Sequence, residues 1–170
     1  MPRVNERLFV MVDIETSGPV YGRHSLVELG AAVGSRDLGV IDRFSTHLLP
    51  ISGEVRQSRR AYQEALRSGL PPAEAMGRFR DWAAPHQARS ASFLARPAAF
   101  DWPWIVYYAW TYLGENPFGF KALCASSWLE ARGMRFDVEI PHIAVEDAEI
   151  QLRHFLERLD GRPGGPHAQS

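Results

Sequence analysis

The chain has 170 residues, of which 45% are hydrophobic and 23% charged, as expected for one globular domain. Its formal net charge of −1 argues against a protein that holds duplex nucleic acid by bulk electrostatics, although a small basic patch could still bind a short end. Cys124 is the only cysteine, which excludes an internal disulfide and a cysteine-based zinc site. The polar first residues and the absence of a long apolar run predict no secretory signal and no membrane span, so we expect a cytoplasmic protein.

The first expected element is a strand that begins near Leu8 and ends in two acids. Phe9 to Val12 is a continuous apolar run, which is typical of a strand buried on both faces. Side chains two apart on a strand point to the same side, so Asp13 and Glu15 should project together. Two neighbouring carboxylates that lose hydration are costly unless a cation or a proton offsets their charge. A divalent metal would do so, and the alternative is a strand that reaches water after Val12.

Two more strands are expected after the Gly18-Pro19 turn, from about Ser25 to Val33 and from Val40 to Leu49. Three successive strands with short turns predict an antiparallel meander, with the acid pair at one end. Glu28 lies inside the second strand, where we expect either a structural role or a role in supporting the residues of the site. The expected apolar anchors of the third strand are Ile41, Phe44 and Leu48.

Two helices are expected next, because apolar residues recur at helical spacing on either side of Gly69 and Pro71-Pro72. An arginine-rich face lies opposite the apolar face of the first helix. Such a face is usually solvated and less often follows a phosphate backbone. The expected inward residues are Val55, Tyr62, Ala65 and Leu66 in the first helix and Met76, Phe79, Trp82 and Ala83 in the second.

Asp101 stands one turn before a long apolar stripe that follows a short strand, Ala91 to Ala95. On this stripe it would lie at the mouth of the core. The commoner explanation for such an acid, taken alone, is a helix N-cap ahead of Trp102-Pro103. Tyr107 and Trp110 fall off the stripe, where they could stack on bases, pack against a second subunit or complete a larger core.

The C-terminal third predicts a helix from Ala122 to Arg132 and a last helix from about Ala144 to Leu159. Asp147 lies in the first turn of the last helix, where an acid also interacts favourably with the helix dipole. His142 stands just before this helix. We expect a single domain over residues 1–160 and a flexible tail over residues 161–170, which are rich in glycine and proline.

Together these acids and the histidine resemble the motifs of the DEDDh 3′→5′ exonucleases of the ribonuclease H-like superfamily, which include the polymerase III proofreading subunit, ribonuclease T and oligoribonuclease. Asp13-Ile-Glu15-Thr-Ser-Gly18 resembles the first motif, Ala98-Ala-Phe-Asp101 the second, and His142-Ile-Ala-Val-Glu-Asp147-Ala148 the third and most specific. The resemblance covers the chain from about Leu8 to Leu159. Many relatives carry His-Asn or a similar pair ahead of the second motif, whereas this chain has Arg96-Pro97, which leaves substrate positioning open but removes no metal ligand.

The resemblance implies an α/β fold, a ribonuclease H-like mixed central β-sheet flanked by α-helices. It also implies a hydrolase that releases nucleoside 5′-monophosphates from the 3′ ends of single-stranded DNA or RNA with two Mg²⁺ or Mn²⁺ ions. Asp13 would bridge both ions, Glu15 and Asp147 would complete one site, and Asp101 would support the other. His142 would be the general base. The residues implied to touch the terminal nucleotide are Thr16, Ser17, Gly18 and Phe100.

Two alternatives stay open. An exoribonuclease specific for short RNA would differ in its contacts to the 2′-hydroxyl group, which the sequence does not locate. A non-catalytic nucleic-acid-binding relative would not need all four acids and the histidine. A homodimer is also open, because some relatives are dimers.

Overall fold

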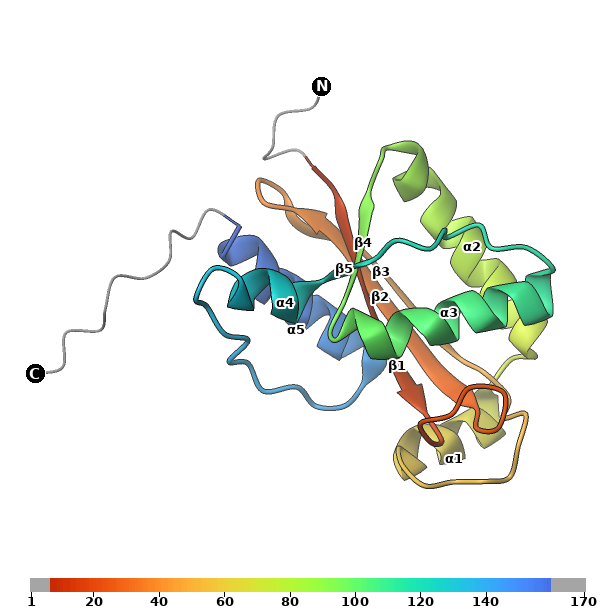
Figure 1. Ribbon diagram of the computed structural model, residues 1–170. Helices are drawn as coiled ribbons and strands as arrows, with labels where there is room; N and C mark the ends of the chain where they lie inside the picture. Colours follow the sequence, from red (N-terminus) through yellow and green to blue (C-terminus); the bar gives the residue numbers. More distant parts are fainter. Residues whose placement is uncertain (1–6, 160–170) are drawn as a thin grey trace, which may run out of the picture.

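The computed structural model describes residues 7–159, in which the chain forms a mixed sheet with helices on both faces (Figure 1). Within these residues the sheet has five strands in the order β3-β2-β1-β4-β5. The central strand β1 pairs antiparallel with β2, which pairs antiparallel with β3, so the predicted meander is confirmed. On its other side β1 is parallel to β4, which is parallel to β5. The strands are β1 (Phe9–Thr16), β2 (Leu26–Ser35), β3 (Gly39–His47), β4 (Ser92–Ala95) and β5 (Leu123–Cys124).

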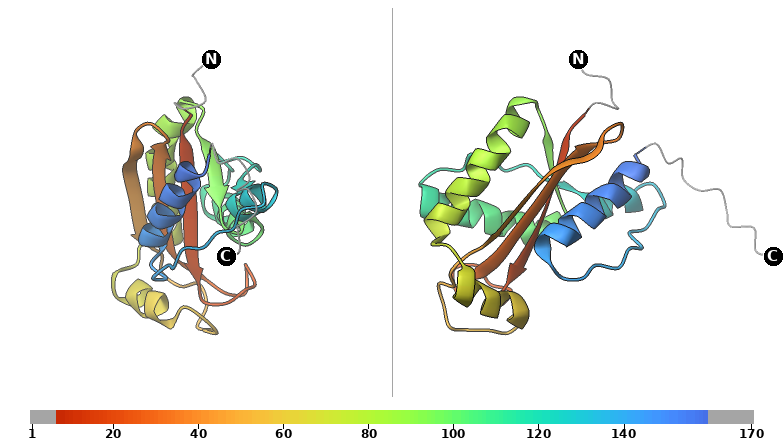
Figure 2. Two further views of the ribbon diagram at one scale, coloured as in Figure 1. Left: turned by 90° about the vertical axis from the view of Figure 1, so that its left-hand side faces the viewer. Right: turned by 180° about the vertical axis from the view of Figure 1, so that it is seen from behind.

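Four helices divide between the two faces of the sheet, and α1 lies at one end of the strands (Figure 2). On one face, α2 and α3 cover Val10 and Val12 of β1. On the other face, α4 and α5 cover Phe9 and Met11. Because strand side chains alternate, Asp13 continues the row of Phe9 and Met11 toward α5. The helices are α1 (Arg59–Ser68), α2 (Pro72–Ala88), α3 (Ala98–Leu113), α4 (Ala125–Glu130) and α5 (Ala144–Glu157).

A close backbone contact places the start of α5 against β2. Gly30 pairs with Asp13 across the sheet, and a Cβ atom at Gly30 would lie 2.2 Å from the carbonyl carbon of Ala144. Only glycine allows the first turn of α5 to approach the strand so closely. The contact therefore brings the residues around the start of α5 to the level of the β1 acids.

Three sequence-based expectations about elements were wrong. The helix expected over Ala122–Arg132 is shorter, because Leu123 and Cys124 pair with β4 as β5 and leave only α4 helical. The expected inward residues Leu66 and Ile41 are 52% and 40% exposed. The buried residues of α1 are Ala61, Tyr62 and Ala65 alone, and β3 is an edge strand in which Thr46 is the only buried residue.

The expected tail over residues 161–170 lies outside the described residues, and the single-domain assignment stays a prediction. None of the helices within residues 7–159 has the length and apolar character needed to cross a membrane.

Candidate active site

Asp13 and Glu15 lie near the end of β1, where the strand emerges from between its neighbours. Asp13 is 7% exposed, and the side chain of Glu15 is 13% exposed. The hydroxyl group of Ser58, just before α1, donates a hydrogen bond to Oε2 of Glu15. These carboxylates are therefore held inside the protein, and the alternative of a strand whose acids are simply solvated is wrong.

The first turns of α5 bring two polar side chains to this point. Asp147 is 1% exposed, and neither of its carboxylate oxygens has a hydrogen-bond partner within residues 7–159. Gln151 lies one turn further along the same face and donates from Nε2 to Oδ1 of Asp13 over 3.0 Å. The α5 face thus supplies one acid and one amide to the β1 acids.

Asp101 reaches the site from α3. This helix begins directly after β4, which lies beside β1, so its first turn is next to the end of β1. The N-cap residue of α3 is Pro97, and Asp101 is a buried residue of the first turn, so the N-cap explanation of Asp101 is wrong. Its Oδ1 accepts a hydrogen bond of 3.2 Å from the backbone N–H of Ile14, and its Oδ2 is buried without a hydrogen-bond partner among the described residues, 7–159.

His142 stands at the mouth of the site, two residues before α5. Its side chain is 77% exposed, and its Nδ1 lies 3.9 Å from Oε1 of Glu15. One ligand atom each from Glu15, His142 and Asp147 lies within 4.8 Å of the others. A hollow of about 460 Å³ opens here between α1 and the segment before α5, and Ser58 and Arg60 line its other side.

Burial and mutual repulsion raise the pKa values of these acids. Burial raises the pKa of Asp13 well above its usual range, and the charges of Asp101 and Asp147 raise it further. Burial also raises the pKa of Asp101 well above normal, and it raises the pKa values of Glu15 and Asp147. A divalent cation would relieve both the repulsion and the unsatisfied oxygens, and an all-carboxylate set suits a hard ion such as Mg²⁺ or Mn²⁺. The residues present therefore fit a catalytic metal site.

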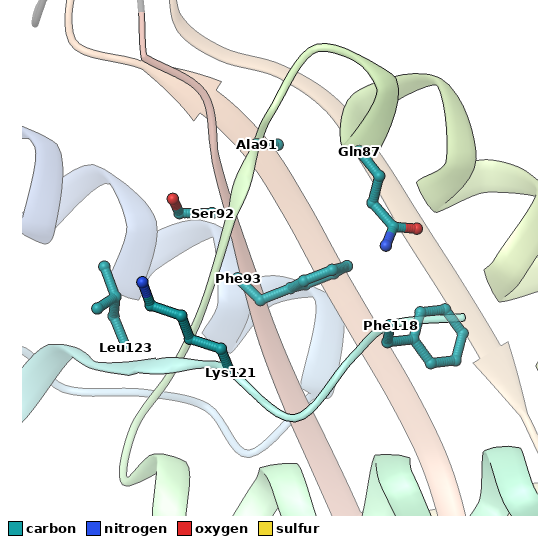
Figure 3. Close-up of a pocket in the computed structure, with 7 residues that line it drawn as sticks. All are labelled: Gln87, Ala91, Ser92, Phe93, Phe118, Lys121 and Leu123. Atoms are coloured by element: carbon teal, nitrogen blue, oxygen red, sulfur yellow. The ribbon is translucent and has the colours of Figure 1, made fainter. Parts of the chain in front are cut away.

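A second pocket, of about 250 Å³, lies at the opposite end of the strands (Figure 3). Ser92 on its wall pairs with Phe9 at the start of β1, whereas the acids stand near the end of β1. Gln87, Phe93, Phe118 and Lys121 also line it, and none of its lining residues is an acid. This pocket is separate from the candidate active site.

Comparisons with known proteins agree with this arrangement. No family model matches the chain. A protein of Escherichia coli named 3′-5′ DNA exonuclease Cap18 is 35% identical over 128 residues, which cover 71% of this chain and 67% of that protein. The nuclease domain of 3′hExo, described as a DEDDh family member and bound to rAMP, superposes with a TM-score of 0.57 at 14% identity over 92% of this chain and 94% of that chain. The chain belongs to the DEDDh 3′→5′ exonuclease family.

Exonuclease I, a larger protein, shares the same fold. Its product-bound structure has a TM-score of 0.66 at 13% identity, and the match covers 89% of this chain and 43% of that chain. The complex of the Escherichia coli enzyme with a dT13 oligonucleotide gives a TM-score of 0.63 at 15% identity, covering 92% of this chain and 42% of that chain. The chain therefore spans less than half the length of exonuclease I, and at this identity the likeness shows the fold alone. The expected ribonuclease H-like mixed sheet is confirmed.

In this DEDDh chain the residues expected to touch a nucleotide lie beside the acids, and they make hydrogen bonds or packing contacts within the protein. Thr16 donates from Oγ1 to the carbonyl of Gly18 over 2.9 Å, and Oγ of Ser17 accepts from the N–H of Ser25 over 2.9 Å. Phe100 is half-buried in the first turn of α3 and packs against the core. Their contact with substrate stays a prediction.

The sequence alone did not identify two other residues of the DEDDh site, Ser58 and Gln151. Gln151 lies four residues after Asp147, so helical spacing alone places it on the same face. Ser58 had no such signal, because it lies in an irregular segment 43 positions from Glu15 in the chain.

Proposed function

We propose that this DEDDh exonuclease removes nucleotides one at a time from the 3′ end of single-stranded DNA. The observation that carries the proposal is the convergence of Glu15, His142 and Asp147, with ligand atoms within 4.8 Å of one another at the mouth of an open hollow. The preference for DNA rests on Cap18, which is named a DNA exonuclease, and on exonuclease I with bound dT13. Because 3′hExo is bound to rAMP, an exoribonuclease specific for short RNA is the alternative.

We infer that Asp13, Glu15, Asp101 and Asp147 hold two divalent ions, Mg²⁺ or Mn²⁺. Two ions are proposed because four ionised carboxylates, three of them buried, carry more negative charge than one dication neutralises. When bound, such ions offset the negative charge that develops on the phosphate and favour ionisation of the attacking water. The hydrogen bonds from Gln151 and Ser58 orient the carboxylates of Asp13 and Glu15 for this role.

His142 acts as the general base in this proposal. Its imidazole is exposed to the hollow, so it can accept the proton of an attacking water and pass it to solvent. Oε1 of Glu15, 3.9 Å from Nδ1, stabilises the positive charge that the ring then carries. Thr16, Ser17, Gly18 and Phe100 surround the terminal nucleotide.

Digestion of matched 5′-labelled DNA and RNA oligonucleotides with Mn²⁺ tests the proposal. We expect the DNA to shorten from its 3′ end with release of nucleoside 5′-monophosphates, and Asp101→Asn to abolish this shortening. His142→Ala should lower kcat by about 10²–10⁴ with a much smaller change in KM. Asp37→Asn, at an exposed acid in the turn between β2 and β3, is the matched control.

Equal turnover in the wild-type and Asp101→Asn proteins would exclude this site. Shortening of RNA alone would favour the exoribonuclease. Binding of single strands without any cleavage would favour a non-catalytic relative.

A homodimer through α3 also stays a prediction. Trp110 is 52% exposed on this helix, whereas Tyr107 is half-buried with its ring 5.5 Å from that of Tyr21. Sedimentation velocity of the wild-type and Trp110→Ala proteins tests this, and a monomeric wild-type protein would end it.

A further inference from the structure

Glu28 is a buried acid that the mechanism above does not use. It lies in the middle of β2, is 1% exposed, and pairs in register with Glu15 of β1. Its Oε1 accepts a hydrogen bond of 3.1 Å from the N–H of Ala144, the first residue of α5. Its Oε2 accepts a hydrogen bond of 2.8 Å from Nη2 of Arg60 in α1. A buried carboxylate is tolerated when each oxygen is paired in this way.

Arg60 connects this buried acid to the candidate general base. The same nitrogen, Nη2, also donates to the carbonyl oxygen of His142 over 2.9 Å. The residue that precedes α5, Ile143, has no side chain that could cap the helix, and Glu28 accepts from the N–H of Ala144, one of the first-turn donors that have no partner within the helix. The ion pair of Glu28 and Arg60 therefore fixes the segment from His142 to Ala144 at both ends.

The position of His142 depends on its backbone. Its side chain is 77% exposed, so packing does not hold the ring near Glu15. The backbone has a φ angle of 58°, in the left-handed region that residues other than glycine adopt uncommonly, and the hydrogen bonds at His142 and Ala144 help to hold it there. We propose that the ion pair of Glu28 and Arg60 positions His142 for proton transfer, so that Arg60 is a positioning residue of the exonuclease reaction. This inference rests on the proposed role of His142 as the base.

Direct binding of a substrate phosphate by Arg60 is the competing explanation. The Arg60 side chain is 52% exposed and lines the hollow beside Glu15 and His142. A phosphate contact would contribute to substrate affinity and would act whether or not His142 is present. A positioning contact would contribute to turnover and would act only through His142. The two explanations differ in kcat, in KM and in their dependence on His142.

The test measures kcat and KM of Arg60→Met on a 5′-labelled oligothymidylate with Mn²⁺. The matched control is Arg59→Met, which removes the same charge from the neighbouring position of α1. The side chain of Arg59 is exposed and makes no hydrogen bond or ion pair within residues 7–159. We expect Arg60→Met to lower kcat by about 10-fold to 100-fold, part of the contribution of a general base, with KM within threefold of wild type. Arg59→Met should stay within twofold in both parameters.

A double-mutant cycle decides how Arg60 acts. If it acts only through His142, adding Arg60→Met to His142→Ala should lower kcat by less than twofold. Arg60→Lys should recover part of the activity, because an ammonium group can still donate to both acceptors. Three outcomes would overturn the proposal. The losses of kcat in Arg60→Met and His142→Ala could multiply in the double variant, Arg60→Met could raise KM alone, or Arg59→Met could lose as much kcat as Arg60→Met.

Two further measurements keep the outcome clear. A cooperative thermal melt shows that each variant is folded. If Arg60→Met does not melt cooperatively, the same cycle is run with Glu28→Gln, which keeps an acceptor for Ala144 but removes the charge that holds Arg60. A wild-type protein without nuclease activity would refute the proposed function. An active wild-type protein in which the kcat losses of Arg60→Met and His142→Ala multiply would refute only the role of Arg60.

Discussion

Replacing Asp147 by asparagine should stabilise the metal-free protein. Asp147 is 1% exposed, its two oxygens lack hydrogen-bond partners within residues 7–159, and one of them lies within 4.8 Å of a Glu15 oxygen. Asparagine keeps the shape of the side chain and removes its charge. The substitution therefore reports on repulsion in the site, with little change in packing.

The magnitude follows from the separation of the charges. Two unit charges 4.8 Å apart repel by about 3.5 kcal/mol at an effective dielectric constant of about 20. Loss of the favourable interaction with the α5 dipole offsets about 0.3–1 kcal/mol, and partial protonation of the acids relieves some repulsion already. We expect a net gain of about 2 kcal/mol at pH 8, which is about 4–8 °C in Tm for a chain of this size.

Thermal and urea unfolding in EDTA measure this gain, with Asp37→Asn as the control at an exposed acid, where we expect less than about 0.5 kcal/mol. Added Mn²⁺ should reverse the order, because it stabilises the wild-type protein by binding to the folded state and stabilises the variant much less. An Asp147→Asn protein that is less stable than wild type in EDTA would refute the reasoning that the acids repel one another in the absence of metal.

Three other predictions concern the same region. The pKa values of the site carboxyls are raised, so the folded protein binds more protons than the unfolded chain. The Tm in EDTA should therefore rise as the pH falls from 8 toward the raised pKa values. A Tm that does not change with pH would contradict this. Gln151→Leu removes the hydrogen bond to Asp13 and should weaken Mn²⁺ binding, measured calorimetrically without substrate, by about tenfold or more; unchanged affinity would exclude its orienting role. Gly30→Ala places a Cβ atom 2.2 Å from the Ala144 carbonyl carbon and should lower the free energy of unfolding, measured in urea, by more than about 3 kcal/mol. Gly77→Ala in α2 is the control, because the space around its Cβ atom is open, and it should not destabilise the protein.

Much of the fold could be predicted because its strands and helices have apolar patterns among residues that are close together in the chain. The apolar run of β1 and the helical stripes of α3 and α5 each follow from residues close together in the chain. The helix expected from Ala122 was wrong at its start for a physical reason. Two residues are too few to show the alternation that indicates a strand, and Leu123 and Cys124 form β5 because they pair with β4. Likewise, Leu66 follows the helical spacing of the apolar residues of α1, but whether it is buried depends on which part of the protein packs against that helix.

The site was predictable for acids that stand next to such patterns, and less so for the residues that support them. Asp13, Asp101 and Asp147 each adjoin a strong strand or helix signal, and the resemblance to the DEDDh motifs linked them. The contact of Arg60 with Glu28 joins positions 32 apart, and its contact with His142 joins positions 82 apart. No spacing rule relates such distant positions, so the contacts follow only from the tertiary fold.

The order of the site residues along the chain bears on when the protein can become active. The first acids belong to β1, whereas His142 and Asp147 arrive with α5, almost at the end of the described residues. A growing polypeptide in which α5 has not yet left the ribosome would hold only part of the charged cluster. Because such an intermediate lacks two of the residues proposed to act in catalysis, we expect it to leave nearby nucleic acid intact until α5 docks against the sheet.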